Sequence, residues 1–348
     1  MKSNLRNLTY DALEEFLVEL GEPKFRARQI FSWLYKGVSS FDEMTNIKKE
    51  LREKLSGIAT LTLPKIEEKF VSRLDETRKY LIKLDDGNYI ESVLMKYNHG
   101  YTVCLSSQVG CRMGCAFCAS TRGGLVRNLE PHEIIGQLMI IEKDLGNRIS
   151  NIVMMGMGEP FDNFDNLMIF LENVSHPDGL CIGHRHITVS TCGIVPKIAE
   201  LARKAPQITL SISLHAANNE MRNAIMPINK KYDIKALLCA CRHYIEITNR
   251  RITFEYTLIC GVNDNLETAA ELAALLRGML CHVNLIPVNP IKETGFKKSK
   301  SDRIEAFRLY LEKHKIAATI RREMGSDINA ACGQLRQNRL QKEGCEPK

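Results

Sequence analysis

Residues 101–118 read Tyr-Thr-Val-Cys-Leu-Ser-Ser-Gln-Val-Gly-Cys-Arg-Met-Gly-Cys-Ala-Phe-Cys, a β-rich run that leads into a cysteine-rich loop. After this stretch, β-rich runs alternate with amphipathic helical patterns along the chain. The β-rich runs cover 101–107, 150–156, 186–191, 208–214, 252–259, 281–287 and 316–321, and the helical patterns cover 131–145, 165–174, 195–204, 233–247, 266–278 and 301–315. Six strand–helix repeats and a closing strand predict an α/β fold, with a parallel sheet curled into a partial barrel.

The chain on either side of this repeat has other patterns. Residues 1–60 carry helical periodicity and predict a helical accessory domain. Residues 61–96 alternate apolar and polar positions around an Asp-Asp-Gly turn signal at 85–87, which predicts a short β-rich connector with a hairpin. We therefore expect a core at 97–335 and a C-terminal tail at 336–348.

The composition is typical of a folded protein that does not cross a membrane. Apolar residues make up 44% and charged residues 26% of the 348, which argues against disorder and against a membrane protein. No apolar run approaches the roughly 18–20 residues that cross a bilayer, and the N-terminus lacks the apolar core of a secretory signal. We expect a cytoplasmic protein with no membrane partner. Most of the 12 cysteines should then be reduced thiols.

The excess of positive charge lies near the C-terminus. The formal net charge is +7, and residues 290–348 alone carry 14 Lys and Arg against 8 Asp and Glu. A localised positive surface attracts phosphate, which makes a polyanion a plausible partner. A solvated helix face is the alternative reading of the same charges.

Polar motifs follow the predicted strands. They comprise Cys111–Cys118 after the first strand, Gly156–Pro160 after the second, Ser190–Gly193 after the third, His215 after the fourth, Asn289 after the sixth, and 325–332 after the last. Barrel enzymes build their sites at the carboxyl ends of the strands. We therefore expect these motifs to share one rim, with Cys332 among them.

The three thiols of Cys111, Cys115 and Cys118 lie within eight residues. A loop of this size can wrap three corners of an iron–sulfur cube and leave one iron open to a substrate. The amino and carboxylate groups of S-adenosylmethionine (SAM) suit that position, and one electron could then cleave its sulfonium bond to give a 5′-deoxyadenosyl radical. A zinc site is the alternative, although structural zinc usually needs four protein ligands and no second Cys or Cys/His pair follows at suitable spacing.

The Cys-x3-Cys-x-aromatic-Cys spacing, with Phe117 as the aromatic residue, resembles the radical SAM superfamily. The resemblance is closer to one branch, the RlmN/Cfr-type adenosine methyltransferases, and covers nearly the whole chain. The matching segments are the helical N-terminus, Gln108–Cys111, Gly156–Pro160, Ser213–His215, Asn284–Pro290 and Ala330–Gln334.

This resemblance implies a radical SAM barrel of the partial (β/α)6 type and an N-terminal domain that binds RNA. It implies a [4Fe–4S] cluster on Cys111, Cys115 and Cys118, and two SAM molecules per turnover, one as methyl donor and one as radical source. The SAM pocket that it implies consists of Gly158, Glu159, Ser190, Ser213, Leu214, His215 and Asn289. Taken singly, Ser190 could instead cap a helix and His215 could be a hydrogen-bonded core residue.

Three further residues have catalytic roles by resemblance. Cys332 resembles the cysteine that carries the methyl group and, as a thio-methylene radical, adds to the adenine ring. Cys104 resembles the thiol that releases the product by forming a disulfide with Cys332, which requires a thiolate within reach. Glu91 is in the place of the proton acceptor, while an exposed hairpin carboxylate is its alternative reading.

The function implied is methylation of adenine carbon-2 in 23S rRNA, at the peptidyl transferase centre, and in tRNA, 3′ of the anticodon. A flavodoxin- or ferredoxin-like electron donor and a monomeric state are expected with it. One alternative is a Cfr-type enzyme that methylates carbon-8 of the rRNA adenine. A non-catalytic, zinc-stabilised RNA-binding protein is an alternative of a different class.

Overall fold

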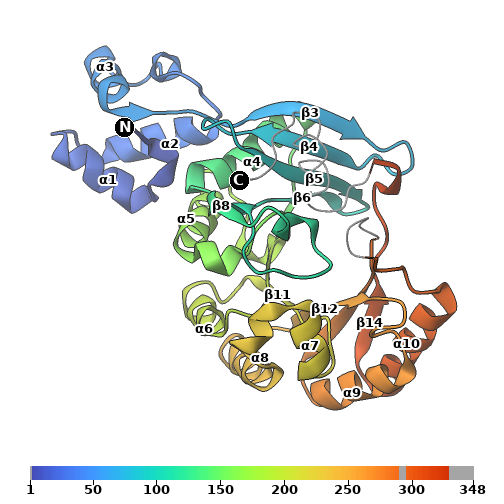
Figure 1. Ribbon diagram of the computed structural model, residues 1–348. Coiled ribbons are helices and arrows are strands. Elements are labelled where there is room, and N and C mark those ends of the chain that lie inside the picture. The colour runs from blue at the N-terminus through green and yellow to red at the C-terminus, as the bar shows by residue number, and fades with distance from the viewer. Residues whose placement is uncertain (1, 290–294, 329–348) are drawn as a thin grey trace.

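The computed structural model describes residues 2–289 and 295–328. Within them a ten-stranded sheet runs in the order β14-β13-β12-β11-β10-β9-β6-β5-β4-β3. The parallel strands are β6 (Gly100–Cys104), β9 (Asn151–Met154), β10 (Ile187–Thr191), β11 (Thr209–Ser213), β12 (Ile252–Leu258), β13 (Cys281–Pro287) and β14 (Ala317–Ile320). Because β14 and β3 stand at opposite ends of this order, the sheet does not close within the described residues, and the predicted partial barrel is confirmed (Figure 1).

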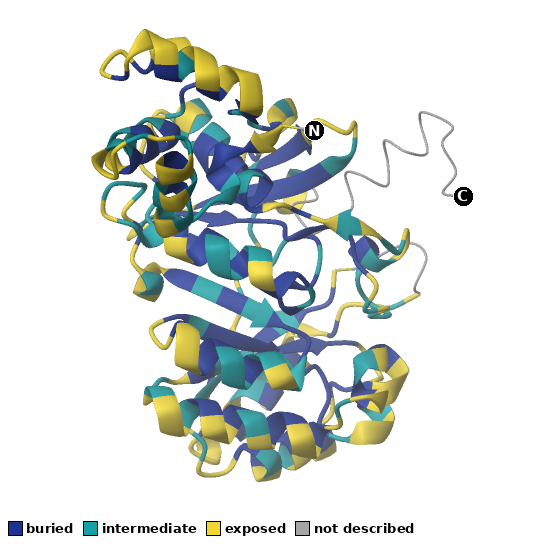
Figure 2. Ribbon diagram, turned by 90° about the vertical axis from the view of Figure 1, so that its left-hand side faces the viewer, coloured by how far each residue is buried: buried dark blue, intermediate teal, exposed yellow. Residues whose placement is uncertain are grey.

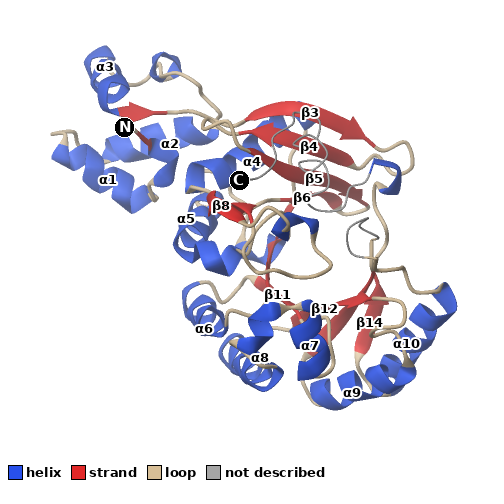
Figure 3. Ribbon diagram, in the orientation of Figure 1, coloured by secondary structure: helices blue, strands red, loops and turns tan. Residues whose placement is uncertain are grey.

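Helices connect successive parallel strands and cover the outer face of the sheet (Figure 3). They are α4 (Pro131–Leu145), α5 (Phe164–Ser175), α6 (Val195–Lys204), α7 (Asn219–Ile225), α8 (Ile234–Thr248), α9 (Leu266–Leu276) and α10 (Ser301–Lys313). All of them except the short α7 bury an apolar stripe against the sheet. On α5, for example, Leu167, Phe170 and Leu171 are fully buried, and burying such a side chain stabilises by about 1.5–3 kcal/mol.

Short elements between the repeats were not predicted. They are α7 and the strand pair formed by β7 (Gln108–Gly110) and β8 (Leu125–Asn128). Strands of three and four residues are too short for an alternating pattern to identify. The β7–β8 pair nevertheless matters, because it brackets the cysteine loop.

Three antiparallel strands extend the sheet beyond β6. They are β3 (Lys65–Val71), β4 (Arg78–Lys83) and β5 (Tyr89–Tyr97), and β5 pairs directly with β6. The turn predicted at 85–87 joins β4 to β5, as expected. The segment before the barrel is thus continuous with the main sheet (Figure 2 shows the buried strands in dark blue).

The N-terminal helices pack beside α4 and α5 (Figure 1). They are α1 (Tyr10–Glu19), α2 (Phe25–Tyr35) and α3 (Lys49–Ile58), with the short parallel pair β1 (Ser3–Asn4) and β2 (Ala59–Thr60). The guanidinium of Arg6 is fully buried among them and donates to the carbonyls of Leu34, Val38 and Leu61. The side-chain amide of Asn173 on α5 donates to the carbonyl of Leu8 (3.0 Å), which ties these helices to the barrel.

Short 3-10 helices complete the described chain, at Leu5–Asn7, Phe41–Glu43, Ala119–Thr121, Pro160–Asn163, His184–His186, Pro227–Lys230 and Ser326–Ile328. No helix in the described part of the chain has the length and apolar character needed to span a membrane.

Candidate active site

A cavity of about 540 Å³ opens at the carboxyl edge of the parallel strands. The predicted site residues that line it are Cys104, Cys111, Cys115, Cys118, Gly158, Glu159, Ser190, Ser213, His215 and Asn289. Leu214 is fully buried in the hydrophobic core instead. Cys332 lies outside the described residues, so its predicted place at the rim stays a prediction.

The cysteine loop, residues 111–121, forms one side of the cavity, which we call the cluster wall. The amide of Cys111 donates to the carbonyl of Gly124 (2.9 Å), and the hydroxyl of Thr121 donates to the carbonyl of Cys118 (2.9 Å). Gly110 has a positive φ of 77°, and a Cβ there would lie 2.0 Å from the carbonyl oxygen of Gly124. Backbone contacts between β7 and β8 therefore hold the loop that carries the thiols.

The surroundings of the three thiols are mostly apolar. Cys115 packs with Ile225 and Met226. Burial raises the pKa of the Cys111 thiol to about 12, and burial, together with the neighbouring thiols, also raises the pKa of Cys115. Without metal the thiols of Cys111 and Cys115 are thus protonated at neutral pH, and metal binding must release their protons.

The donor set fits an iron–sulfur cube better than a single ion. All three thiols line the cavity, but no three His, Cys, Asp or Glu side chains of the described residues converge closely enough to hold one metal ion. A mononuclear zinc site needs its sulfurs about 2.3 Å from one point. A cube binds each sulfur at a different corner and accepts a wider spacing.

Beside the cluster wall, residues 156–159 pass very close to Gln108. Gly158 has a φ of 101°, and a Cβ on it would meet the Gln108 side chain at 2.6 Å. The Glu159 carboxylate accepts from the amides of Cys192 (2.7 Å) and Phe161 (3.0 Å). Burial raises the pKa of Glu159 despite these hydrogen bonds. The carboxylate therefore organises the backbone around the cavity.

His215 is buried and touches the cluster wall through its ring. Its centroid lies 4.8 Å from that of Phe117 in an edge-to-face arrangement. The amide of Thr257 donates to Nδ1 (3.0 Å), so the neutral ring carries its proton on Nε2. Burial, together with nearby Arg222, lowers the pKa of His215 to about 3. The imidazole is therefore a neutral hydrogen-bonding group.

A second side of the cavity, the sheet wall, consists of Val93, Met95, Cys104 and Met324, which pack together. Val93 and Cys104 are cross-strand partners on β5 and β6. Met324 comes from the loop after β14. The sheet wall thus brings together residues more than two hundred positions apart.

Glu91 lies on β5 two residues before Val93, so both point to the same face of the sheet. It is 3% exposed, which excludes the alternative of an exposed hairpin carboxylate. Its Oε2 lies 3.9 Å from the Nζ of fully buried Lys79. This buried ammonium favours the ionised carboxylate.

Sequence reasoning gave no role to Arg222, which supports the backbone of the predicted SAM pocket. Its guanidinium is fully buried and donates to the carbonyls of Cys192 (2.7 Å), Leu214 (3.1 Å) and Ser213 (3.2 Å). A lone arginine on the unpredicted helix α7 offers no local pattern that marks it as buried.

Three lysines of the positively charged C-terminal region, which lie just before α10, have mixed surroundings. Lys297, Lys298 and Lys300 are exposed, as expected for a phosphate contact. Lys298 forms an ion pair with Glu323 (2.8 Å), so part of its charge is neutralised.

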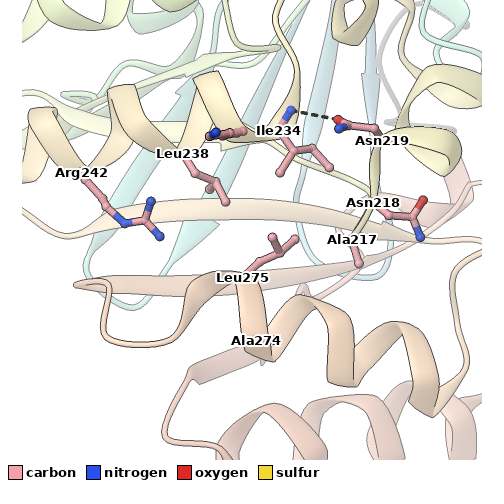
Figure 4. Close-up of a pocket in the computed structure, with 9 residues that line it drawn as sticks. Ala217, Asn218, Asn219, Ile234, Leu238, Arg242, Ala274 and Leu275 are labelled. Atoms are coloured by element: carbon pink, nitrogen blue, oxygen red, sulfur yellow. Dashed lines mark hydrogen bonds between the residues drawn. The ribbon is translucent and has the colours of Figure 1, made fainter.

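Another cavity, of about 470 Å³, lies between α8 and α9 on the outside of the barrel (Figure 4). Asn219, Ile234 and Leu238 contribute to its lining, and the side-chain oxygen of Asn219 accepts from the amide of Ile234 (3.0 Å). None of the predicted site residues that the structure describes lines this second cavity.

Comparison with known proteins matches the chain in two segments and as a whole. Residues 3–61 match the ribosomal RNA large subunit methyltransferase N-terminal domain, and residues 105–273 match the radical SAM superfamily. Curated relatives named probable dual-specificity RNA methyltransferase RlmN include one from Clostridium novyi, 56% identical over 336 residues, covering 96% of this chain and 98% of that protein. Another, from Caldanaerobacter subterraneus, is 56% identical over 342 residues, covering 98% and 99%.

A solved structure has the same overall fold. The crystal structure of a radical SAM methyltransferase from Sphaerobacter thermophilus superposes with a TM-score of 0.90 at 45% identity, covering 95% of this chain and 98% of that one.

Proposed function

Because the chain belongs to the RlmN family of dual-specificity RNA methyltransferases in the radical SAM superfamily, we propose that it methylates carbon-2 of adenine. The proposed targets are the adenosine near the peptidyl transferase centre of 23S rRNA and the adenosine 3′ of the anticodon in tRNA. One observation carries the proposal: Cys104, which is not one of the three motif thiols, lines the same cavity as Cys111, Cys115 and Cys118. A thiol in that place suits a reaction that passes through a protein–RNA adduct.

The family implies a [4Fe–4S] cluster and SAM. The cluster, when bound, supplies the electron that cleaves SAM. We assign Cys111, Cys115 and Cys118 as its ligands, in agreement with their shared cavity. The groups proposed to hold SAM are Gly158, Glu159, Ser190, Ser213, Leu214, His215 and Asn289, of which Leu214 can contribute only its main chain because its side chain is in the core.

Cys332 is proposed to carry the methyl group. Its thiolate would take a methyl from one SAM, and the S-methyl group would lose a hydrogen atom to the radical derived from a second. The resulting thio-methylene radical would add to carbon-2 of the adenine, and the adduct radical would then give one electron back to the oxidised cluster and the carbon-2 proton to a base, which restores the aromatic ring. Cys104 would then attack the sulfur of Cys332, forming a disulfide and breaking the bond between that sulfur and the methylene carbon, which becomes a methyl on gaining a proton.

Glu91 is proposed to accept the carbon-2 proton as the ring regains aromaticity. Glu91 does not itself line the cavity, but its place on the same face of β5 as the cavity-lining Val93 and its proximity to Lys79 support this role. A buried carboxylate needs a positive neighbour to stay ionised, and only the ionised form is a base.

Further parts of the proposal rest on the family resemblance. These are RNA binding by the domain at 1–60, the β-rich connector at 61–96, the core at 97–335 and the tail at 336–348. A flavodoxin- or ferredoxin-like electron donor, a monomeric state and a cytoplasmic location also belong to the proposal.

Trapping the adduct tests the function. With cluster, SAM, reductant and unmodified rRNA under anaerobic conditions, Cys104→Ala should add to the RNA but fail to release it. A denaturing gel should then show a nuclease-sensitive shift, absent from the Cys104→Ala, Cys332→Ala double variant. Cys260→Ala, which removes an exposed thiol outside the cavity, should turn over normally.

Normal turnover by Cys104→Ala, or an adduct that survives loss of Cys332, would exclude these roles. Mass spectrometric fragmentation of the wild-type product locates the methyl group. A methyl on carbon-8 would instead assign the Cfr-type reaction.

A further inference from the structure

Gln108 is fully buried beside the cavity but does not line it. It opens the matched segment Gln108–Cys111, and the proposed function gives it no role. Its side-chain oxygen accepts from the amide of Glu159 (2.8 Å), and its side-chain nitrogen donates to Oδ2 of Asp162 (3.0 Å) and to the side-chain oxygen of Asn128 (2.8 Å). The side chain of Gln108 therefore joins the strand pair β7–β8 to the loop that follows β9.

Three hydrogen bonds form a closed ring here, which we call the Gln108 ring. The amide of Glu159 donates to Gln108, Gln108 donates to Asp162, and the amide of Asp162 donates back to the carbonyl of Glu159 (3.0 Å). An ionised carboxylate can only accept and a main-chain amide can only donate, so the side-chain amide of Gln108 fits in one orientation. The Gln108 ring therefore fixes the direction in which the main chain of Glu159 faces.

Other contacts hold the rest of this loop. Hydrogen bonds with the segment 105–108 hold residues 156–157. The carboxylate of Glu159 is held by two further amides, as described above. The main-chain amide of Glu159, by contrast, donates to Gln108, and Gly158 lies directly against the same side chain. Loss of the Gln108 ring should therefore loosen Gly158 and Glu159 while the start of the loop stays in place.

Gly158 and Glu159 line the cavity and belong to the groups proposed to hold SAM. When a site adopts its binding conformation only part of the time, the apparent dissociation constant rises by the inverse of that fraction. A buried amide left without a partner is unfavourable enough to make other conformations of these two residues competitive. The strength of SAM binding should thus depend on a side chain that SAM does not touch.

We propose that Gln108 and Asp162 are positioning residues for SAM, which hold the main chain of Gly158 and Glu159 in the conformation that binds it. The inference rests on the SAM pocket proposed above. Neither Gln108 nor Asp162 lines the cavity, so both act through the main chain and not by contact with SAM. Oδ1 of Asp162 also pairs with the guanidinium of Arg112, which connects the Gln108 ring to the cluster wall.

The test inverts the polarity of one bond in the Gln108 ring. Gln108→Glu keeps the shape and the acceptor for the amide of Glu159, but it sets a second carboxylate against Asp162, and like charges repel. Adding Asp162→Asn gives the new carboxylate a donor again and restores the original net charge. Asn128 can turn its side-chain amide to donate in both variants, so the difference between them comes from residue 162.

SAM binding is measured by equilibrium dialysis of labelled SAM against cluster-loaded, full-length protein, kept anaerobic and without reductant so that SAM is not cleaved. Gln108→Glu should raise the dissociation constant about 5- to 20-fold, as expected for one buried hydrogen bond left unmade. The Gln108→Glu, Asp162→Asn double variant should return to within about threefold of wild type. Hydrogen exchange of the peptide that contains 158–159 should be faster in the single variant and normal again in the double variant.

Further measurements separate positioning from general damage. Iron content should be the same in wild type and both variants, and kcat for SAM cleavage without RNA should be unchanged at saturating SAM while KM rises. Tyr244→Phe is the matched control, because it loses one buried hydrogen bond to the carbonyl of Ile208 at the other end of the barrel, just before β11. It should bind SAM as the wild type does.

A dissociation constant for Gln108→Glu within about twofold of wild type overturns the proposal, and so does a double variant that binds SAM no better than the single one. A loss of iron together with SAM affinity also overturns it, because the damage then extends to the cluster. If the wild type itself binds no SAM, the proposed pocket is refuted and the positioning role with it. Behaviour of the wild type thus tells failure of the pocket from failure of the Gln108 ring.

Discussion

The cluster wall and the sheet wall enclose one cavity but are constructed differently. The cluster wall takes its thiols from eight consecutive residues, held by backbone hydrogen bonds and by the close approach of Gly110 to Gly124. The sheet wall takes its residues from β5, β6 and the loop after β14, held by side-chain packing. The group proposed to bind the cofactor is thus local in sequence, whereas the groups proposed to act on RNA depend on the whole barrel.

The largest effect should come from removing a thiol of the cluster wall. In Cys115→Ala, two thiols remain for a cube that needs three, so we expect no stable cluster and no SAM cleavage. Iron analysis and deoxyadenosine measurement after anaerobic reconstitution check this result. Cys260→Ala serves as the control, and full iron content in Cys115→Ala would refute the ligand assignment.

The matching change at Glu91, on β5 beside the sheet wall, should leave the cofactor intact. Glu91→Gln has nearly the same shape but cannot accept a proton, so methylated RNA should form at least about 100-fold more slowly. Iron content and SAM cleavage without RNA should match the wild type. If product forms at the wild-type rate, Glu91 is not the base; if iron is lost as well, the two walls are not independent.

The close backbone approach at the cluster wall can be tested with a pair of glycines. Gly110 and Gly261 both have positive φ, but a Cβ at Gly110 meets the carbonyl of Gly124 whereas one at Gly261 meets nothing within 4 Å. Each alanine should cost about 1–2 kcal/mol for the left-handed conformation. Gly110→Ala should cost about 1–3 kcal/mol more through the steric clash. Equal free energies of unfolding for Gly110→Ala and Gly261→Ala would show that the cysteine loop can shift to accommodate the added Cβ at little cost.

His215 should make stability depend on pH. Its pKa is about 3 in the folded chain against 6.5 when exposed, so below pH 6.5 the unfolded chain binds a proton that the folded chain does not. Stability from this group is complete above pH 6.5 and falls as the pH drops towards 3, by about 2 kcal/mol at pH 5. The melting temperatures of wild type and His215→Gln should therefore converge from pH 7.5 to pH 5. A constant difference would contradict the depressed pKa.

The smallest effect should come from the exposed lysines outside both walls. Replacing Lys297, Lys298 and Lys300 by Ala should weaken RNA binding and reduce the slope of log K against log salt by about two, because Lys298 is already paired with Glu323. Lys235→Ala, on the outside of the barrel, is the control. Identical salt slopes in the triple variant and the wild type would indicate solvated lysines.

The two walls also explain what the sequence could predict. The repeat of strands and helices predicted the barrel because each element is long enough to show its period. Cys111, Cys115 and Cys118 were found because their chemistry lies in one short segment. Contacts between residues far apart in the sequence could not be predicted. No local pattern marks Arg222 as the buried donor to the carbonyls of Cys192 and Ser213, and none relates Met324 to Cys104.

Arg6 gives the N-terminal helices a property that concerns RNA shape. Burial lowers its pKa only to about 10, so a charged guanidinium is held by three main-chain carbonyls, and removing it would take a charged donor away from all three. Asn173 and His132 fasten the same segment to the barrel. These contacts therefore hold the N-terminal helices at a fixed distance from the cavity. These helices are proposed to bind RNA, and their distance from the cavity is the same for both proposed RNAs. We therefore expect each RNA to bend or unpair until its adenosine reaches the cavity.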